Sequence, residues 1–161
     1  MQLSAILPEE RIVVDPSGRR VTDKASAIRL LAELLAPALH TDAQEVERML
    51  LEREQLQSTA IGEGVAIPHA AMDAIADRAA ALVLCPQGVE FDSLDGQPAQ
   101  IILGVVGPRQ ATAEHLRVLA RVSRLLRSKD TREQLLQAAD PHSARELVMR
   151  DDHEHQPGSG A

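Results

Sequence analysis

The sequence contains no tryptophan and no tyrosine, and only one phenylalanine among its 161 residues. A surface that stacks aromatic side chains on bases or sugar rings is therefore not expected. Because 44% of the residues are nevertheless hydrophobic, the core must be built from Leu, Ile, Val and Ala. A chain of this length is expected to form one compact domain with a sizeable core.

Cysteine and long uncharged apolar runs are also scarce. The single cysteine, Cys85, excludes an internal disulfide, and its place in the run AAALVLC indicates a buried thiol. No segment supplies the ~18 uncharged apolar residues of a membrane span. The N-terminus MQLSAILPEER has no basic stretch followed by a long apolar run, as a secretion signal would. We therefore expect a cytoplasmic protein without membrane insertion.

Positive charge is in deficit. The chain has 24 acidic against 17 basic residues, a formal charge of −7, and no cluster of Lys and Arg stands out along it. Nucleic acids and anionic membranes attract basic surfaces. Neither is therefore expected as a direct partner.

The first third of the chain has the apolar periodicity of helices. Residues 24–39 place leucines and isoleucine on one face, and Pro37 is expected to distort or end this helix early. The sequence TDAQ has the form of a capping box in which Thr41 accepts from the Gln44 amide. It predicts a second helix that runs to about Glu54.

The rest of the chain predicts strands and then helices. The continuous apolar runs 79–85 and 99–107 are typical of strands buried on both faces. Residues 112–128 are strongly helical, and the cap signals DTRE at 130–133 and SARE at 143–146 indicate two shorter helices. Helices at both ends with buried strands between them predict a three-layer α/β/α sandwich, in which helices flank a mostly buried sheet.

The domain is expected to occupy residues 1–150. The end of the chain, 151–161, has the sequence DDHEHQPGSGA, which is charged and then rich in Pro, Gly and Ser. Such a composition favours a disordered tail.

The stretch STAIGEGVAIPHA ends in His69, whose neutral imidazole could attack phosphorus without a separate base. Gly62 and Gly64 would let backbone amides approach an anion, and the hydroxyls of Ser58 and Thr59 would add donors. These five residues form a candidate site for a phosphoryl group. The alternative from residue types alone is a turn and a short strand ending in a surface histidine.

Two further residues could complete this site. His115 shares the core-facing edge of its helix with Val118, and it follows the expected cap Thr112, where the helix dipole favours a neutral ring. It could donate one N–H to a phosphoryl oxygen, or be a core-edge histidine bonded to a carbonyl. Arg53 ends the apolar stripe of the second helix and could face a phosphoryl group, or cap the helix C-terminus.

A metal site is the main alternative of another class. His69 and His115 could bind a metal with help from His153 and His155 in the tail. No third well-placed ligand is evident in the core, and His-x-His among acidic residues is typical of a solvated terminus. No metal is therefore expected.

These segments also resemble a family. LLEREQLQSTAIGEGVAIPHA resembles the active-site signature of type-2 enzyme IIA domains of the bacterial phosphoenolpyruvate-dependent sugar phosphotransferase system. VEFDSLDGQPAQIILGVVGP and EHLRVLARVSRLL resemble two further segments of that family, so that the resemblance covers about residues 20–150. One departure is Ala60, where the family usually has Gly.

The resemblance implies a function for each candidate residue. His69 would accept a phosphoryl group from a small HPr-like or NPr-like phosphocarrier protein and pass it on. His115 would hydrogen-bond the group, Arg53 would lie near it, and the fold would be a mixed sheet flanked by helices. Neither a nucleotide nor any other cofactor is expected. Ile61, Val65 and Ile67 are candidates for an apolar docking surface.

Two branches of the family differ in their downstream partner. A nitrogen-type regulator would bind regulatory target proteins according to its phosphorylation state. A fructose- or mannitol-specific subunit would instead pass phosphate to a IIB domain during sugar uptake. The opening LSAILPEERIVVD resembles the nitrogen-type proteins, and no IIB or IIC domain is fused to the chain. We favour the regulator.

Overall fold

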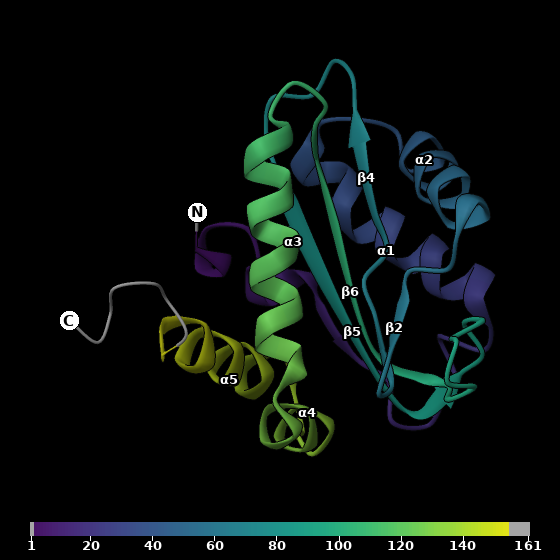
Figure 1. Cartoon of the computed structure of the whole chain (residues 1–161), viewed down its shortest axis with the longest axis vertical. Coiled ribbons are helices and arrows are strands. Elements are labelled where there is room, and N and C mark those ends of the chain that lie inside the picture. The colour runs from purple at the N-terminus through teal and green to yellow at the C-terminus, as the bar shows by residue number, and fades with distance from the viewer. Residues whose placement is uncertain (1, 155–161) are drawn as a thin grey trace.

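The computed structural model describes residues 2–154, which contain five α-helices and six strands (Figure 1). The helices are α1 Lys24–Leu39, α2 Ala43–Leu56, α3 Thr112–Arg127, α4 Lys129–Leu136 and α5 Pro141–Glu154. The strands are β1 Ile12–Val14, β2 Ala60–Gly62, β3 Val65–Ala66, β4 His69–Met72, β5 Ala79–Val89 and β6 Ala99–Pro108. Two short 3-10 helices, η1 Leu3–Ala5 and η2 Glu9–Arg11, precede β1. No helix in this part of the chain is long and apolar enough to span a membrane.

The strands form one mixed sheet in the order β1-β5-β6-β3-β2. β5 and β6 pair antiparallel at its centre, while β1 runs parallel to β5 and β3 parallel to β6. β4 continues the path of β3 along the same edge of β6, so that His69 lies opposite Val105. The strand that begins at His69 is thus held by the most buried strand pair of the sheet.

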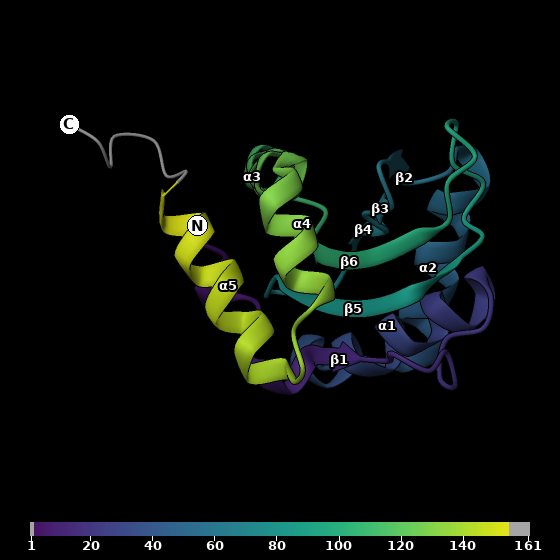
Figure 2. The ribbon, with the colours of Figure 1, turned by 90° about the horizontal axis from the view of Figure 1, so that it is seen from below.

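Helices cover both faces of the sheet, which confirms the predicted α/β/α sandwich. Alternate residues of β5 enter two separate cores: Ala81, Val83 and Cys85 face α1 and α2. Leu82 and Leu84 face α3, α4 and α5 on the other side. Figure 2 shows α1 and α2 on one side of the β5–β6 pair and α3 and α4 on the other. Burial raises the pKa of the Cys85 thiol to about 12, so this cysteine is a structural core residue.

The first two helices form where expected but with different ends. Asp42, not Thr41, caps α2 by accepting from the Gln44 amide at 2.9 Å, so the predicted capping box is wrong. The aspartate side chain, one residue nearer to the helix, reaches the same amide. Pro37 does not end α1 early, because the helix continues to Leu39 and closes on a left-handed His40.

The caps of the last three helices were also predicted one to three residues too late. Ala111 precedes α3 without a side-chain cap, and the hydroxyl of Thr112 instead donates to the Arg109 carbonyl. Ser128 caps α4 by accepting from Thr131. At α5, the side chain of Asp140 accepts from the Ser143 amide. A polar side chain just before the first helical turn is what satisfies its free amides.

The last helix extends past residue 150, where the domain was expected to end. α5 continues to Glu154, and Asp151 and Asp152 are buried. Asp152 accepts from the Leu3 amide at 3.1 Å and forms an ion pair with Arg121, which joins α5 to both η1 and α3. Residues 155–161 of the expected tail lie outside the described residues.

Candidate functional site

His69 is the first residue of β4, and its ring lies in a pocket of about 460 Å³. The preceding residue is anchored to the sheet, because the Pro68 carbonyl accepts from the Val105 amide at 3.0 Å. Arg53 from the end of α2 and His115 from the first turn of α3 line the same pocket. The structure therefore brings together the three residues expected to handle the phosphoryl group.

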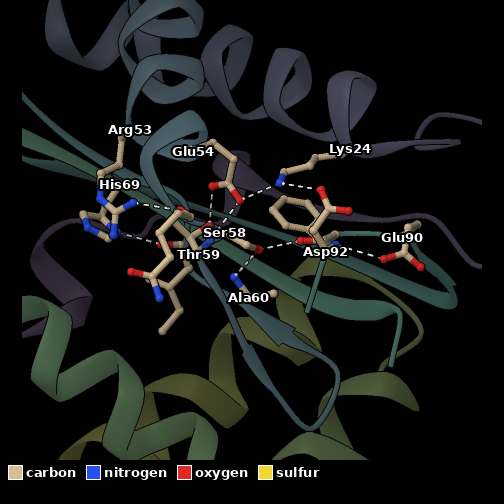
Figure 3. A network of polar contacts seen from close by, with 12 residues as sticks. Lys24, Arg53, Glu54, Ser58, Thr59, Ala60, His69, Glu90 and Asp92 are labelled. Atoms are coloured by element: carbon tan, nitrogen blue, oxygen red, sulfur yellow. Dashed lines mark hydrogen bonds and ion pairs between the residues drawn. The ribbon is translucent and has the colours of Figure 1, made fainter. Parts of the chain in front are cut away.

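One ring nitrogen of His69 is already occupied. Its Nδ1 lies 2.8 Å from the carbonyl oxygen of Ile67 (Figure 3). Because a carbonyl can only accept, Nδ1 carries the hydrogen, and in the neutral ring Nε2 keeps a lone pair. Burial lowers the pKa of His69, the Ile67 carbonyl raises it, and Arg53 lowers it again. The neutral ring, with its nucleophilic nitrogen at Nε2, is favoured near pH 7.

His115 is buried and close to His69. The two ring centroids lie 5.9 Å apart with an angle of 53° between the ring planes. Burial, then the charge of Arg78, then that of His69 lower the pKa of His115 to about 4. The ring is therefore neutral near pH 7, first because it is buried and then because of the nearby charge of Arg78.

Arg78 was not identified from the sequence, although it anchors the start of α3. Its guanidinium is buried, forms an ion pair with Glu114 at 3.1 Å and donates to the Ala111 carbonyl at 3.3 Å. The same carbonyl accepts from the His115 amide at 3.0 Å. The guanidinium lies so close to Gly107 that an added Cβ there would come within 2.6 Å of it. A charged residue directly before a buried strand was the signal available in the sequence.

Arg53 lies beside His69 in Figure 3. Its Nη1 donates to the Gln57 carbonyl at 2.9 Å, which bends the side chain back over the C-terminus of α2. No carboxylate within residues 2–154 forms an ion pair with it. Its remaining N–H groups and full charge are thus available to an anion in the pocket.

The hydroxyls of Ser58 and Thr59 are used within the protein. Ser58 Oγ donates to the Phe91 carbonyl at 2.5 Å, and Thr59 Oγ1 donates to Glu54 at 2.6 Å. Each hydroxyl has only one hydrogen to give. The expectation that they donate to a phosphoryl group is therefore wrong in this conformation, and they fix the loop between α2 and β2.

Gly62 and Gly64 also do not reach His69. The Gly64 carbonyl bonds with the start of β6, whereas His69 lies opposite Val105. At the rise of a strand this separation is ~13 Å, too far for an amide to donate to a group on the ring. Their φ angles of +93° and +78° show that they form the turn between β2 and β3.

The predicted docking surface is partly wrong as well. Val65 and Ile67 are buried, and only Ile61 of the three is exposed, at 53%. Leu56, the last residue of α2, is instead 83% exposed and lines the pocket. Leu116, the residue after His115 in α3, is 60% exposed. A partner that reaches His69 would meet Leu56.

The metal alternative gains no further ligand. Within the described residues, no group of three His, Cys, Asp or Glu side chains is placed to hold a metal ion. The side chain of His153 and all of His155 lie outside the described part of the chain.

The comparisons with known proteins show the family to which this fold and this pair of histidines belong. The family model described as "Phosphoenolpyruvate-dependent sugar phosphotransferase system, EIIA 2" matches residues 5–150. The chain belongs to this family. Its relatives include both nitrogen regulatory proteins and sugar-specific EIIA components.

Three relatives illustrate this. A nitrogen regulatory protein of Bradyrhizobium diazoefficiens is 35% identical over 75% of this chain and 79% of its own. A fructose-specific EIIA component of Haloferax volcanii is 31% identical over 91% and 94%. The crystal structure of the nitrogen regulatory protein IIA-Ntr from Neisseria meningitidis superposes with a TM-score of 0.83, at 30% identity, over 89% of this chain and 97% of its own.

Proposed function

We propose that the protein carries a phosphoryl group on Nε2 of His69 and acts in the cytoplasm as a nitrogen-type regulator. The observation that carries the proposal is the bond between His69 Nδ1 and the Ile67 carbonyl. It fixes the tautomer that leaves Nε2 free, in the pocket shared with His115 and Arg53.

The chemistry is transfer between two histidines. The Nε2 lone pair attacks the phosphorus of a phosphohistidine on an HPr-like or NPr-like carrier, one N–P bond forms, and the donor's N–P bond breaks. The donor ring leaves with the electron pair. Positive charge develops on the ring of His69, where the Nδ1–H bond to Ile67 stabilises it.

His115 and Arg53 stabilise the transferred group. A neutral His115 can donate one N–H to a phosphoryl oxygen without adding a charge that would have to be neutralised after transfer. Arg53 has no carboxylate partner in the described part of the chain, and its planar guanidinium suits phosphoryl oxygens. Together they offer both a neutral and a charged donor to the same group.

The regulatory role is supported by the relatives. Nitrogen regulatory proteins are similar over most of the chain, in sequence and in structure. A phosphoryl group on His69 would add about two negative charges in the pocket that the exposed Leu56 lines. Such a change switches the binding of a target protein by repulsion or by pairing with its arginines.

A sugar-specific role is the second candidate. It is favoured by the similarity to a fructose-specific EIIA component that spans nearly the whole of both chains. In that role His69 would pass its phosphate to a IIB domain.

The two roles separate in a transfer assay. The protein is phosphorylated with phosphoenolpyruvate, enzyme I and each phosphocarrier in turn, and is then mixed with fructose- and mannitol-type IIB domains. The regulator retains its phosphate in the presence of IIB. Rapid transfer to either IIB domain would overturn the regulatory assignment in favour of sugar uptake.

A further inference from the structure

Glu54 is a buried carboxylate next to Arg53 in sequence, and its side chain is only 3% exposed. Glu54 accepts from the Thr59 amide at 2.9 Å and the Thr59 hydroxyl at 2.6 Å, and forms an ion pair with Lys24 at 2.9 Å. Two charge-assisted bonds to one residue hold the loop that leaves α2.

The bonds continue from Glu54 to the nucleophile. The carbonyl of Thr59 accepts from the Ile67 amide at 3.0 Å. The carbonyl of Ile67, at the other end of that residue, accepts from His69 Nδ1 at 2.8 Å. Figure 3 shows the contacts between Glu54 and Thr59, with His69 to their left. Glu54 is thus linked to the His69 ring by hydrogen bonds through Thr59 and Ile67.

The neighbouring residue holds the same loop from its other end. Arg53 donates to the Gln57 carbonyl, whereas Glu54 binds Thr59 two residues later. Two consecutive residues at the end of α2 therefore bind the backbone of the same loop, Arg53 at Gln57 and Glu54 at Thr59. A displaced Thr59 would move Ile67 and Arg53 together.

Lys24 connects this arrangement to α1. Besides Glu54, its ammonium contacts Asp92 at 3.2 Å and lies 5.1 Å from the centre of the buried Phe91 ring. The Phe91 carbonyl in turn accepts from Ser58, the residue before Thr59. The loop between α2 and β2 is held on both sides, and Glu54 is the acceptor at its centre.

We propose that Glu54 is a positioning residue for phosphoryl transfer, which acts through Thr59 and Ile67 to hold the His69 ring with Nε2 toward the pocket. The proposal rests on the proposed function, in which His69 is the phosphoryl acceptor. A rigid ring matters because transfer requires in-line geometry, and small displacements of a reacting group cost large factors in rate.

The test uses two variants and two matched controls. Glu54→Gln removes the charge at constant shape, and Thr59→Val removes the hydroxyl donor. Thr59→Ser keeps that donor. Glu47→Gln is the control on the same helix, because Glu47 also forms an ion pair to α1, with Arg29 at 3.5 Å, but lies outside the His69 pocket.

Two measurements are made on the full chain. ¹⁵N NMR of the unphosphorylated protein gives the tautomer of the His69 ring. Rapid-quench assays with the phosphocarrier give the transfer rate and the half-saturating carrier concentration. We expect Glu54→Gln to mix the two tautomers and to lower the maximal rate about tenfold at unchanged half-saturation. We expect Thr59→Val to change the tautomer ratio and the maximal rate in the same direction. The controls Thr59→Ser and Glu47→Gln should have the tautomer and the rate of the wild type.

A folded Glu54→Gln protein with the wild-type tautomer and rate would overturn the proposal. If Glu54→Gln does not fold, the comparison of Thr59→Val with Thr59→Ser decides, and equal tautomers and rates in that pair overturn it. A wild type that takes no phosphate on His69 would instead refute the proposed function. The tautomer measurement needs no phosphate, so it tests the role of Glu54 separately from the proposed function.

Discussion

The imidazole rings of His69 and His115 lie with their centroids 5.9 Å apart, although one comes from the start of β4 and the other from the first turn of α3. The two rings differ in environment. His69 has a carbonyl that stabilises a positive ring, whereas His115 has the buried cation Arg78, which opposes one. One ring is thus suited to form a bond to phosphorus, and the other to donate a hydrogen bond while neutral.

Removal of the Arg53 charge should slow transfer without unfolding the protein. We expect Arg53→Gln to lower the rate of phosphorylation by the carrier about 100-fold, because the guanidinium faces charge that develops in the transition state. Rapid-quench kinetics measure the rate. Arg48→Gln, on the exposed side of the same helix, is the control and should keep it. Equal rates in the two variants would show that Arg53 only caps α2.

After burial, the charge of Arg78 should contribute most to the low pKa of His115. Arg78→Met removes a cation that opposes the imidazolium, so the pKa of His115 should rise from about 4 toward its ordinary value. Arg78→Lys retains the charge and should leave the pKa low. NMR titration of the His115 ring measures both. A pKa that does not change in Arg78→Met would mean that burial alone keeps the ring neutral.

The same group makes stability depend on pH. Because the folded protein holds His115 at a pKa of about 4 and the unfolded chain returns it to 6.5, the unfolded state binds more protons between these values. The free energy of unfolding should therefore fall as the pH falls through this window, by up to about 3 kcal/mol from His115. Above the window this loss is absent.

Urea unfolding at several pH values, from 7 down to 4, measures this loss in the free energy of unfolding. His115→Asn lacks the titrating ring, so the wild type should lose more stability than the variant over that range. The difference cancels the common contribution of Asp and Glu side chains. Parallel pH profiles for the two proteins would contradict the low pKa of His115.

Gly62 should contribute to the stability of the hairpin between β2 and β3 and not to the rate of phosphoryl transfer. Its φ of +93° is strained for any side chain, and an added Cβ would lie 3.1 Å from Asp95. We expect Gly62→Ala to lower the free energy of unfolding by about 1 kcal/mol or more, yet to accept phosphate at the wild-type rate. Thermal denaturation and the phosphorylation assay test this. A large loss of rate in a folded variant would restore the amide role inferred from the sequence.

Much of the fold was predictable because the apolar pattern dictates it. Continuous apolar runs predicted β5 and β6, 3.6-residue periodicity predicted α1, α2 and α3, and cap signals predicted α4 and α5. Helix starts were mistaken because several polar residues compete for each cap, and backbone geometry decides between Thr41 and Asp42. Burial of Asp152 depends on Arg121 and Leu3, which lie far away in sequence.

The residues suited to bind a phosphoryl group could be predicted from the sequence, but the buried residues that hold them in place could not. His69, His115 and Arg53 were recognised as residue types suited to phosphate, and the fold gathers them. Arg78 and Glu54 were missed because their partners, Ala111, Glu114 and Lys24, come from other elements. A residue that acts through such contacts leaves little trace in local sequence.

The central claim is that Nε2 of His69 carries the phosphoryl group. The most direct measurement is ³¹P and ¹⁵N NMR of the protein after phosphorylation by phosphoenolpyruvate, enzyme I and the phosphocarrier, under alkaline conditions that spare phosphohistidine. We predict a single phosphohistidine, bonded at Nε2, in the wild type and none in His69→Ala. A phosphoryl group on Nδ1, or one that persists in His69→Ala, would contradict the account.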